Sequence, residues 1–253
     1  MSQSLPPTIR DARVPETQRS REQASVLLSS VVTILVGPPE QNQTFFIHKD
    51  LIVRRAPFFR NALGSDWAES DQNTVKLPED DPSTFFLYIQ LLYTGTLSLK
   101  GADPEFTKLI NLYILAEKLQ DVETRNIVMD TLLATVFPPE GEGRTGYLPN
   151  LENVQLIFDG TPEGSPLREY VVDVYAHGVS HQRMQARSKH IENPPEFLLM
   201  LAVKLMKLRD AKSLPSRLCL VPVVSDPSKY HVKEPEQQDR EQQDYTDTTP
   251  SEK

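Results

Sequence analysis

The sequence has few of the features that mark secreted or membrane-spanning proteins. Cys219 is the one cysteine among 253 residues, so no disulfide can form within the chain and a reducing compartment is expected. The longest apolar run, residues 197–203, ends at Lys204 and is far shorter than the ~18 residues that a membrane-spanning helix needs. The first residues lack the apolar core of a secretory signal. We therefore expect an intracellular protein of the cytoplasm or nucleus.

Positive charge is also scarce, because 27 lysine and arginine residues stand against 35 aspartate and glutamate residues. The formal net charge of −8 and the pI of about 5.2 argue against nucleic acid as the main partner, since a phosphate backbone binds basic surfaces. The hydrophobic content of 38% is enough for one substantial core and a smaller second one. We expect other proteins as partners, with no binding to nucleic acid or membrane.

Residues that could carry catalysis or bind a metal occur in patterns that favour structural roles. His177 and His181 are four residues apart, which can place two imidazoles on one helical face, but no glutamate lies between them to serve a zinc hydrolase as its base. No Gly-Lys-Ser/Thr sequence follows the glycines, and Cys219 lies between two leucines, which favours an inert thiol. We predict no catalytic residue, no metal and no cofactor. A small metal-dependent enzyme with its site in residues 150–213 remains as an alternative.

The N-terminal part of the chain predicts a polar tail followed by a β-hairpin. Residues 1–24 are rich in proline and polar side chains, which is typical of a disordered tail. Residues 31–36 are rich in β-branched side chains, and the Gly37-Pro38-Pro39 sequence ends this strand. Residues 45–48 form the returning strand, and a further short strand is expected at residues 74–77.

The returning strand runs directly into two short helices. Asp50 is predicted to cap the first helix, because its carboxylate can accept hydrogen bonds from the free amides of the next turn. Pro57 disfavours helix at the preceding Ala56 and suits the first turn of a new helix, so the two helices are expected to meet there. His48 is interpreted as a structural histidine that donates to a backbone carbonyl at the strand-to-helix turn. The side chains expected in the core of this stretch are Phe46, Leu51 and Phe59.

Three longer helices are predicted downstream. The first begins at Asp81-Pro82 and ends at Gly95, the second begins at Asp103-Pro104, and the third spans residues 122–136. Aspartate followed by proline is a typical helix start, because the carboxylate caps the helix and proline fits its first turn. The apolar stripes comprise Phe85, Ile89, Leu92 and Tyr93 in the first helix, and Leu109, Leu112, Tyr113, Ala116 and Leu119 in the second.

These blocks, in this order, resemble the BTB/POZ family over residues 29–135. The family pattern of a strand that ends in aromatic-x-apolar-His-Lys, an apolar helix and a second helix with Phe-Phe is matched here, and so is the later Tyr-Thr-Gly. The matching residues are Phe46, His48, Lys49, Asp50, Phe58, Phe59, Tyr93 and Gly95. The resemblance implies an α+β BTB/POZ fold, in which a small sheet is flanked by a cluster of α-helices, and a role in protein–protein interaction rather than catalysis.

A helical region and an acidic tail are predicted beyond this domain. Residues 136–149 contain a Pro/Gly-rich break and form the linker, residues 150–213 are helical, and residues 221–253 form a disordered acidic tail. The C-terminal half resembles that of BTB-only proteins common in filamentous fungi. In its clearest amphipathic helix one stripe needs a partner, either the BTB helices or another protein, and consists of Leu198, Leu201, Leu205 and Leu208.

A candidate contact with a cullin follows from the resemblance. Cullin-linked BTB adaptors carry a hydrophobic-x-Glu motif after the two-helix hairpin, and Trp67-Ala68-Glu69 occupies that position. The resemblance implies that Trp67 enters a pocket of the cullin scaffold and that Glu69 meets a donor there. The alternative is that Trp67 covers this protein's own core and Glu69 caps a turn.

Three functions remain open at this point. The resemblance implies a protein-interaction module that serves as substrate adaptor of a cullin-type E3 ubiquitin ligase, with the C-terminal part holding the target. The first alternative is a self-assembling scaffold or a transcription-associated interaction protein without a ligase role, and the second is the metal-dependent enzyme above. BTB homodimers of the zinc-finger class use a long apolar N-terminal helix. Because residues 1–22 are polar, self-association is expected to be weak.

Overall fold

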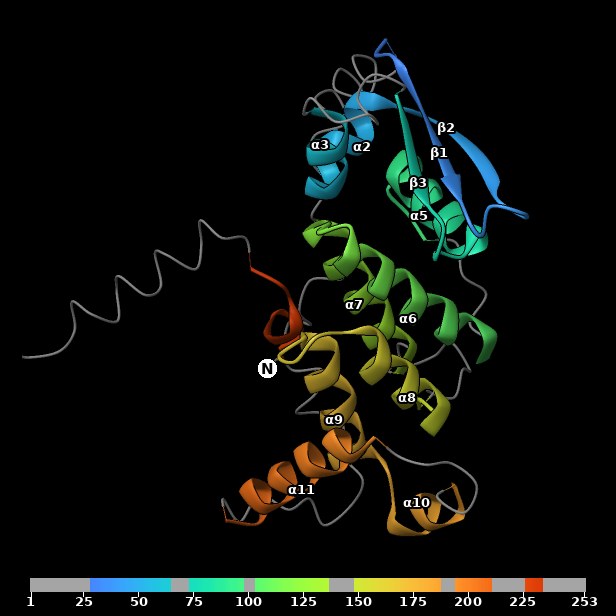
Figure 1. The fold of residues 1–253 in the computed structure, drawn as a ribbon. Coiled ribbons are helices and arrows are strands. Elements are labelled where there is room, and N and C mark those ends of the chain that lie inside the picture. The colour runs from blue at the N-terminus through green and yellow to red at the C-terminus, as the bar shows by residue number, and fades with distance from the viewer. Residues whose placement is uncertain are drawn as a thin grey trace, which may run out of the picture. The chain divides into compact units, whose positions relative to one another are not determined.

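The structure, a computed structural model, describes residues 28–64, 73–97, 103–136, 148–187, 194–210 and 226–233. The chain forms two compact units, residues 1–82 and residues 83–253, and each is described by itself. The first unit contains the sheet and two short helices, and the second is helical (Figure 1). The α+β fold predicted from the sequence, with a small sheet followed by a helical region, is confirmed. Within the described residues, no helix is both long and apolar enough to cross a membrane.

The sheet of the first unit has three strands in the order β2-β1-β3. Strand β1 (Val31–Val36) pairs antiparallel with β2 (Gln43–His48) and parallel with β3 (Thr74–Leu77). Alternate residues of β1 are fully buried, as the two-residue period of a strand requires when one face covers the core. On the two outer strands the buried side chains are Phe45, Ile47, Val75 and Leu77.

Two short helices follow β2 without a loop. Helix α2 (Lys49–Arg55) ends at Ala56, whose extended backbone (φ −119°, ψ 108°) is the conformation that a following proline favours, and α3 (Pro57–Gly64) begins at Pro57. The predicted break between the helices is therefore confirmed. The ammonium of Lys49 reaches 14 residues along the chain and donates to the Leu63 carbonyl, with an Nζ–O distance of 3.1 Å. This bond joins the start of α2 to the end of α3.

Three predictions for this stretch are wrong. Phe46 is 71% exposed, because Phe45 and Ile47 take the buried phase of β2 and every second side chain points to the opposite face. Leu51 is only half-buried, since α2 turns Ile52 and Ala56, four residues apart, toward the core. Asp50 is not the cap: α2 begins at Lys49, so Asp50 lies in the first turn, where its charge suits the helix dipole. The cap position belongs to His48, which has no side-chain capping bond there.

The second unit is built from helices that pack against one another. Helix α6 packs against α7 and α8, α9 packs against α8, and α11 packs against both α9 and α8. The short 3₁₀ helix η1 contacts α7 and α9. The elements are α5 (Pro82–Thr94), α6 (Asp103–Lys118), α7 (Val122–Val136), α8 (Leu151–Gly160), α9 (Pro166–Gly178), α10 (His181–Arg187), α11 (Pro195–Asp210) and η1 (Pro227–Tyr230).

The predicted apolar stripes are largely confirmed in this unit. All five apolar residues predicted for α6 are buried, and α7 has the predicted bounds. In α5, Phe85 and Leu92 are buried as predicted, but Tyr88 takes the place assigned to Ile89. The Tyr88 hydroxyl donates to Asp121 at 3.0 Å, and the same carboxylate accepts from the backbone N–H of Thr124 at 2.9 Å in the first turn of α7.

One part of the predicted disordered tail is ordered. Residues 226–233 are described, and Tyr230 of η1 is 1% exposed. Its ring packs edge-on against Tyr170, with 5.6 Å between the ring centroids. The prediction of a tail over residues 221–253 is therefore wrong for this segment, because a single aromatic anchor in a polar stretch docks onto α9. Most of the remaining tail and linker residues lie outside the described part of the chain.

The core of the first unit provides a direct test of the strand phase. Phe59→Ala should lower the free energy of unfolding by about 3–5 kcal/mol, because Phe59 is fully buried and its removal leaves a cavity. Phe46→Ala is the matched control and should change stability by less than about 0.5 kcal/mol. Denaturant titration of the full chain measures both variants. Equal losses for the two phenylalanines would contradict the burial pattern of β2.

Candidate protein-interaction surface

The two residues of the proposed cullin contact lie outside the described residues. Trp67 and Glu69 fall in the segment between α3 and β3, residues 65–72, of which nothing is described. The contact that the sequence predicts for them therefore stays a prediction.

The residues that match the family pattern have structural roles in the two units. Lys49 closes the end of α3, as described above, and Phe58 stacks edge-on against the buried Phe59, with ring centroids 5.1 Å apart. In the second unit, Gly95 follows the last residue of α5 in a left-handed conformation (φ 67°), which glycine adopts without steric cost. Tyr93 in the last turn of α5 is half-buried.

His177 and His181 do not share a helical face. Helix α9 ends at Gly178, Val179 is extended (φ −108°, ψ 121°), and α10 begins at His181. His177 is 5% exposed, whereas His181 is exposed. Burial lowers the pKa of His177, so its imidazole is neutral at pH 7. In the described part of the chain no cluster of three or more metal-ligating side chains occurs.

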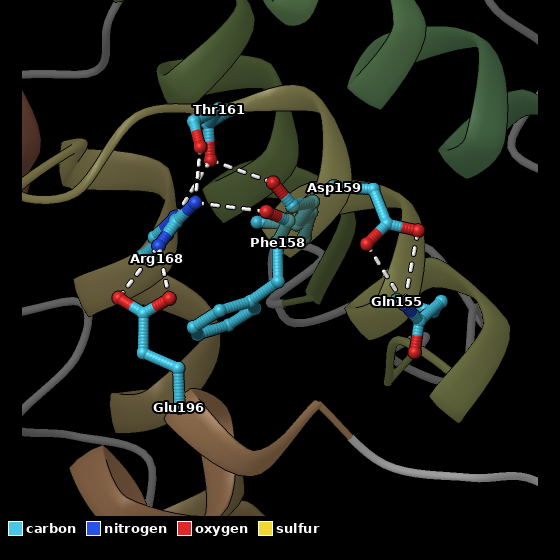
Figure 2. Close-up of polar contacts among 7 residues, drawn as sticks. Gln155, Phe158, Asp159, Thr161, Arg168 and Glu196 are labelled. Carbon is cyan, nitrogen blue, oxygen red and sulfur yellow. Dashed lines mark hydrogen bonds and ion pairs between the residues drawn. The ribbon is translucent and has the colours of Figure 1, made fainter.

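A buried arginine links the ends of three helices. Arg168, in the first turn of α9, is 5% exposed; it donates through Nε to the Thr161 hydroxyl at 3.0 Å and through Nη2 to the Phe158 carbonyl at 2.8 Å (Figure 2). Its Nη1 lies 2.6 Å from both carboxylate oxygens of Glu196, at the start of α11. The guanidinium also lies over the Phe158 ring, 4.8 Å from the centroid. Arg168 thereby joins α11 to the C-terminal end of α8.

A second buried charge on α9 joins α11 and η1. Asp173 is 5% exposed and accepts from Lys204 of α11 at 2.6 Å, from the Tyr230 hydroxyl at 2.8 Å and from Lys229. Burial alone would raise the pKa of Asp173, but the hydrogen bonds from these three side chains outweigh it and hold the pKa below its ordinary value. The carboxylate is therefore ionised at neutral pH.

Helix α11 is attached through its first turn and through Lys204 in its middle. Phe197 is its one fully buried side chain among the residues described, and its ring packs edge-on against Phe158 and Tyr175, with centroid distances of 5.7 and 5.2 Å. Together with Glu196 and Lys204, this ring fixes α11 on α8 and α9. The rest of the helix gains little from burial, although it is rich in apolar side chains.

The exposed apolar side chains of α11 form the candidate surface, here called the α11 face. It consists of Leu198, Leu199, Val203, Leu205 and Met206, which are between 40% and 65% exposed. Leu199, Val203 and Met206 follow one another at spacings of four and three residues, which places them on one side of the helix. Contiguous exposed apolar side chains of this kind are typical of surfaces that bind proteins, membranes or apolar ligands.

Sequence reasoning found the helix but only part of this face. The predicted stripe contained Leu198 and Leu205, which are exposed, and Leu201 and Leu208, which are half-buried. The prediction missed Leu199, Val203 and Met206. Apolar residues occur on every side of this helix, and helical spacing alone selected a single stripe among them. The overlooked signal was the large number of apolar residues in the helix, since a helix with apolar side chains on all sides must be covered on all sides.

A comparison with protein families finds a match to the first part of the chain. The family model described as "BTB/POZ domain" matches residues 26–133. A solved structure of the BTB (Tramtrack and Bric a brac) domain of human Gigaxonin is similar at 10% sequence identity, with a TM-score of 0.36; the similarity covers 52% of this chain and 99% of that one. No protein among the curated ones matches the chain.

The Asp173 cluster predicts a pH dependence of stability. Because the folded-state pKa of Asp173 is depressed, its ionised form contributes stability that is complete above about pH 4, the pKa of an unfolded aspartate, and is lost as the pH falls through the folded-state pKa. Asp173→Asn should remove this part of the acid dependence and lower stability at pH 7 by about 2 kcal/mol. The control is Asp210→Asn, whose carboxylate is 70% exposed and should matter little. Denaturant titrations from pH 3 to pH 7 measure this, and an unchanged acid profile in Asp173→Asn would refute the assignment.

Proposed function

Because residues 26–133 form a BTB/POZ domain, which is a protein-interaction fold, we propose that this protein is a non-enzymatic adaptor that holds two proteins together. In this proposal the BTB/POZ domain binds a cullin scaffold, and the α11 face binds the protein that is to be ubiquitinated. The match to the BTB/POZ family supports the interaction role in general. The two assignments of partners rest on separate observations, given next.

The α11 face is the observation that carries the adaptor proposal. Burying a leucine or methionine side chain against a partner gains roughly 1.5–3 kcal/mol relative to leaving it in water, so five such side chains represent a large binding potential. The helix is held at its first turn by Phe197 and Arg168, which reduces the entropy lost on binding. We infer that the partner presents an apolar groove or helix, because anchors at i, i+4 and i+7 suit such recognition.

The cullin assignment rests on the sequence of residues 67–69. A tryptophan at the desolvated centre of an interface is among the side chains that dominate binding energy, and a nearby carboxylate can accept from a donor of the scaffold. The alternative within the same class is a self-assembling or transcription-associated scaffold that binds partners without a ligase. In that case Trp67 would serve this protein's own core, and its removal would destabilise the fold rather than a complex.

The cullin assignment predicts the outcome of affinity capture from cell extract with identification of bound proteins by mass. Wild type should recover a cullin, and Trp67→Ala and Glu69→Lys should each lose it while remaining folded. An anchor of this type contributes about 2 kcal/mol or more, which is about thirtyfold in affinity. Absence of cullin from the wild-type sample would favour the scaffold function. Retention of cullin by Trp67→Ala would refute the assignment of the site.

The target-binding role of α11 predicts a separate loss in the same experiment. The double variant Leu199→Asp/Met206→Asp should still recover cullin but lose a second set of proteins, because both side chains are more than half exposed and their replacement spares the fold. Lys207→Asp is the matched control, since it adds negative charge to the same helix without removing an apolar side chain. A double variant that unfolds, as judged by its melting temperature, would instead show that the α11 face is covered by this chain itself.

A further inference from the structure

Residues 226–233 bind to the second unit through the kinds of contact by which proteins bind peptides. Helix η1 within this segment contacts α7 and α9 (Figure 1). Tyr230 is the one buried side chain of the segment, and its ring packs edge-on against Tyr170 of α9. The four residues before Tyr230 and Lys233 after it are exposed. The segment is therefore held by one aromatic anchor and by polar contacts, rather than by a core of its own.

Asn126 of α7 binds the backbone of this segment. Its Nδ2 donates to the Val232 carbonyl at 3.1 Å, and its Oδ1 accepts from the Val232 N–H at 2.7 Å. The amide thus uses a donor and an acceptor on the same residue of the bound chain. Because both bonds go to the backbone, they place no demand on the side chain at this position. The same pairing is available to a peptide from another protein.

Two carboxylates select the side chains of the bound segment. Asp173 of α9 is 5% exposed and accepts from the Tyr230 hydroxyl and from Lys229. Asp130 of α7 lies 2.7 Å from Nε2 of His231. The binding residues, here called the η1 site, are Asn126, Asp130, Tyr170 and Asp173. The site therefore fits a tyrosine that has a cation before it and a hydrogen-bond donor after it.

Asp173 makes an empty η1 site unfavourable. Release of the segment would leave this buried carboxylate with Lys204 alone among the partners described above, and a buried charge that loses its hydrogen bonds is costly. Another chain replaces the segment most readily when it brings a tyrosine hydroxyl and a cation to the same carboxylate. Residues 211–225 join α11 to the segment, which therefore competes as a tethered ligand, at an effective concentration on the order of 1 mM.

We propose that the η1 site is a peptide-binding site of this protein, which residues 226–233 occupy until a partner peptide of the same chemistry replaces them. The partner is a segment of another protein in which lysine or arginine precedes a tyrosine and histidine follows it. The segment of this chain acts as an internal competitor and keeps the site closed when the partner is scarce. The η1 site shares no residue with the α11 face, and the inference does not depend on either partner assigned above.

Fluorescence anisotropy with a labelled peptide of residues 226–233 tests this exchange on the full chain. In Tyr230→Ala the internal segment loses its anchor, so the peptide should bind with a dissociation constant of roughly 10–300 µM. Wild type should bind it about tenfold more weakly, because its own segment competes. A peptide with the Tyr230→Ala substitution is the control and should not bind. Absence of binding to the Tyr230→Ala protein, or equal affinity for both proteins, would overturn the proposal.

A further pair of variants locates the bound peptide. In the Tyr230→Ala background, Asn126→Ala should weaken peptide binding by about tenfold or more, because the backbone of the peptide loses both bonds. Gln155→Ala is the matched control: it removes an amide of α8 that bonds to Asp159, and it should leave the affinity unchanged. Equal affinities of the two variants would show that the peptide binds elsewhere and would contradict the assignment.

A milder variant keeps the test independent of the folding of Tyr230→Ala, which melting curves measure. His231→Ala removes the contact with Asp130 but keeps the buried tyrosine, so it weakens the internal segment without leaving a cavity. The labelled peptide, which retains its histidine, should bind His231→Ala more tightly than wild type, and Asn126→Ala should again weaken this binding. A folded His231→Ala protein that binds the peptide no better than wild type would overturn the proposal.

Discussion

Two buried charges on one helix determine how the C-terminal region is arranged. Arg168 and Asp173 lie on α9, and each is neutralised by residues far away in the sequence: Glu196 and Lys204 on α11, and Lys229 on η1. A buried charge without its partner is costly, so the loss of α11 or η1 from α9 would leave a buried charge unpaired or expose it to solvent. The attachment of α11 therefore relies largely on ion pairs and a single aromatic ring, and the side chains of the α11 face stay exposed.

The α11 face lies outside the residues that match the BTB/POZ family. Residues 26–133 provide the BTB/POZ domain, a fold for protein interaction, and the region after it adds a helix whose exposed side is apolar. The two parts lie in different stretches of the chain.

Local signals in the sequence were sufficient where structure is decided locally. The break at Ala56 and Pro57 and the bounds of α7 were predicted correctly, because proline chemistry and helical periodicity act within a few residues. The exposure of Phe46 was predicted wrongly, since two adjacent phenylalanines fit either phase of a strand and only pairing with β1 decides between them. Tyr230 was missed in a polar tail, because its partner Asp173 is 57 residues away. The α11 face was only partly predicted for a similar reason. Packing against α8 and α9 decides which side of α11 is buried, and these helices are distant in the sequence.

The central claim is that the α11 face is open to solvent in the free protein while Glu196, Phe197 and Lys204 hold the helix on α8 and α9. Hydroxyl-radical footprinting of the full chain, read out by mass spectrometry, tests this without knowledge of any partner. Leu199 and Met206 should be labelled strongly and Phe197 scarcely at all, in line with their exposures of 65%, 53% and 0%. Protection of Leu199 and Met206 to the level of Phe197 in the isolated protein would show that the chain covers this face itself and would contradict the account.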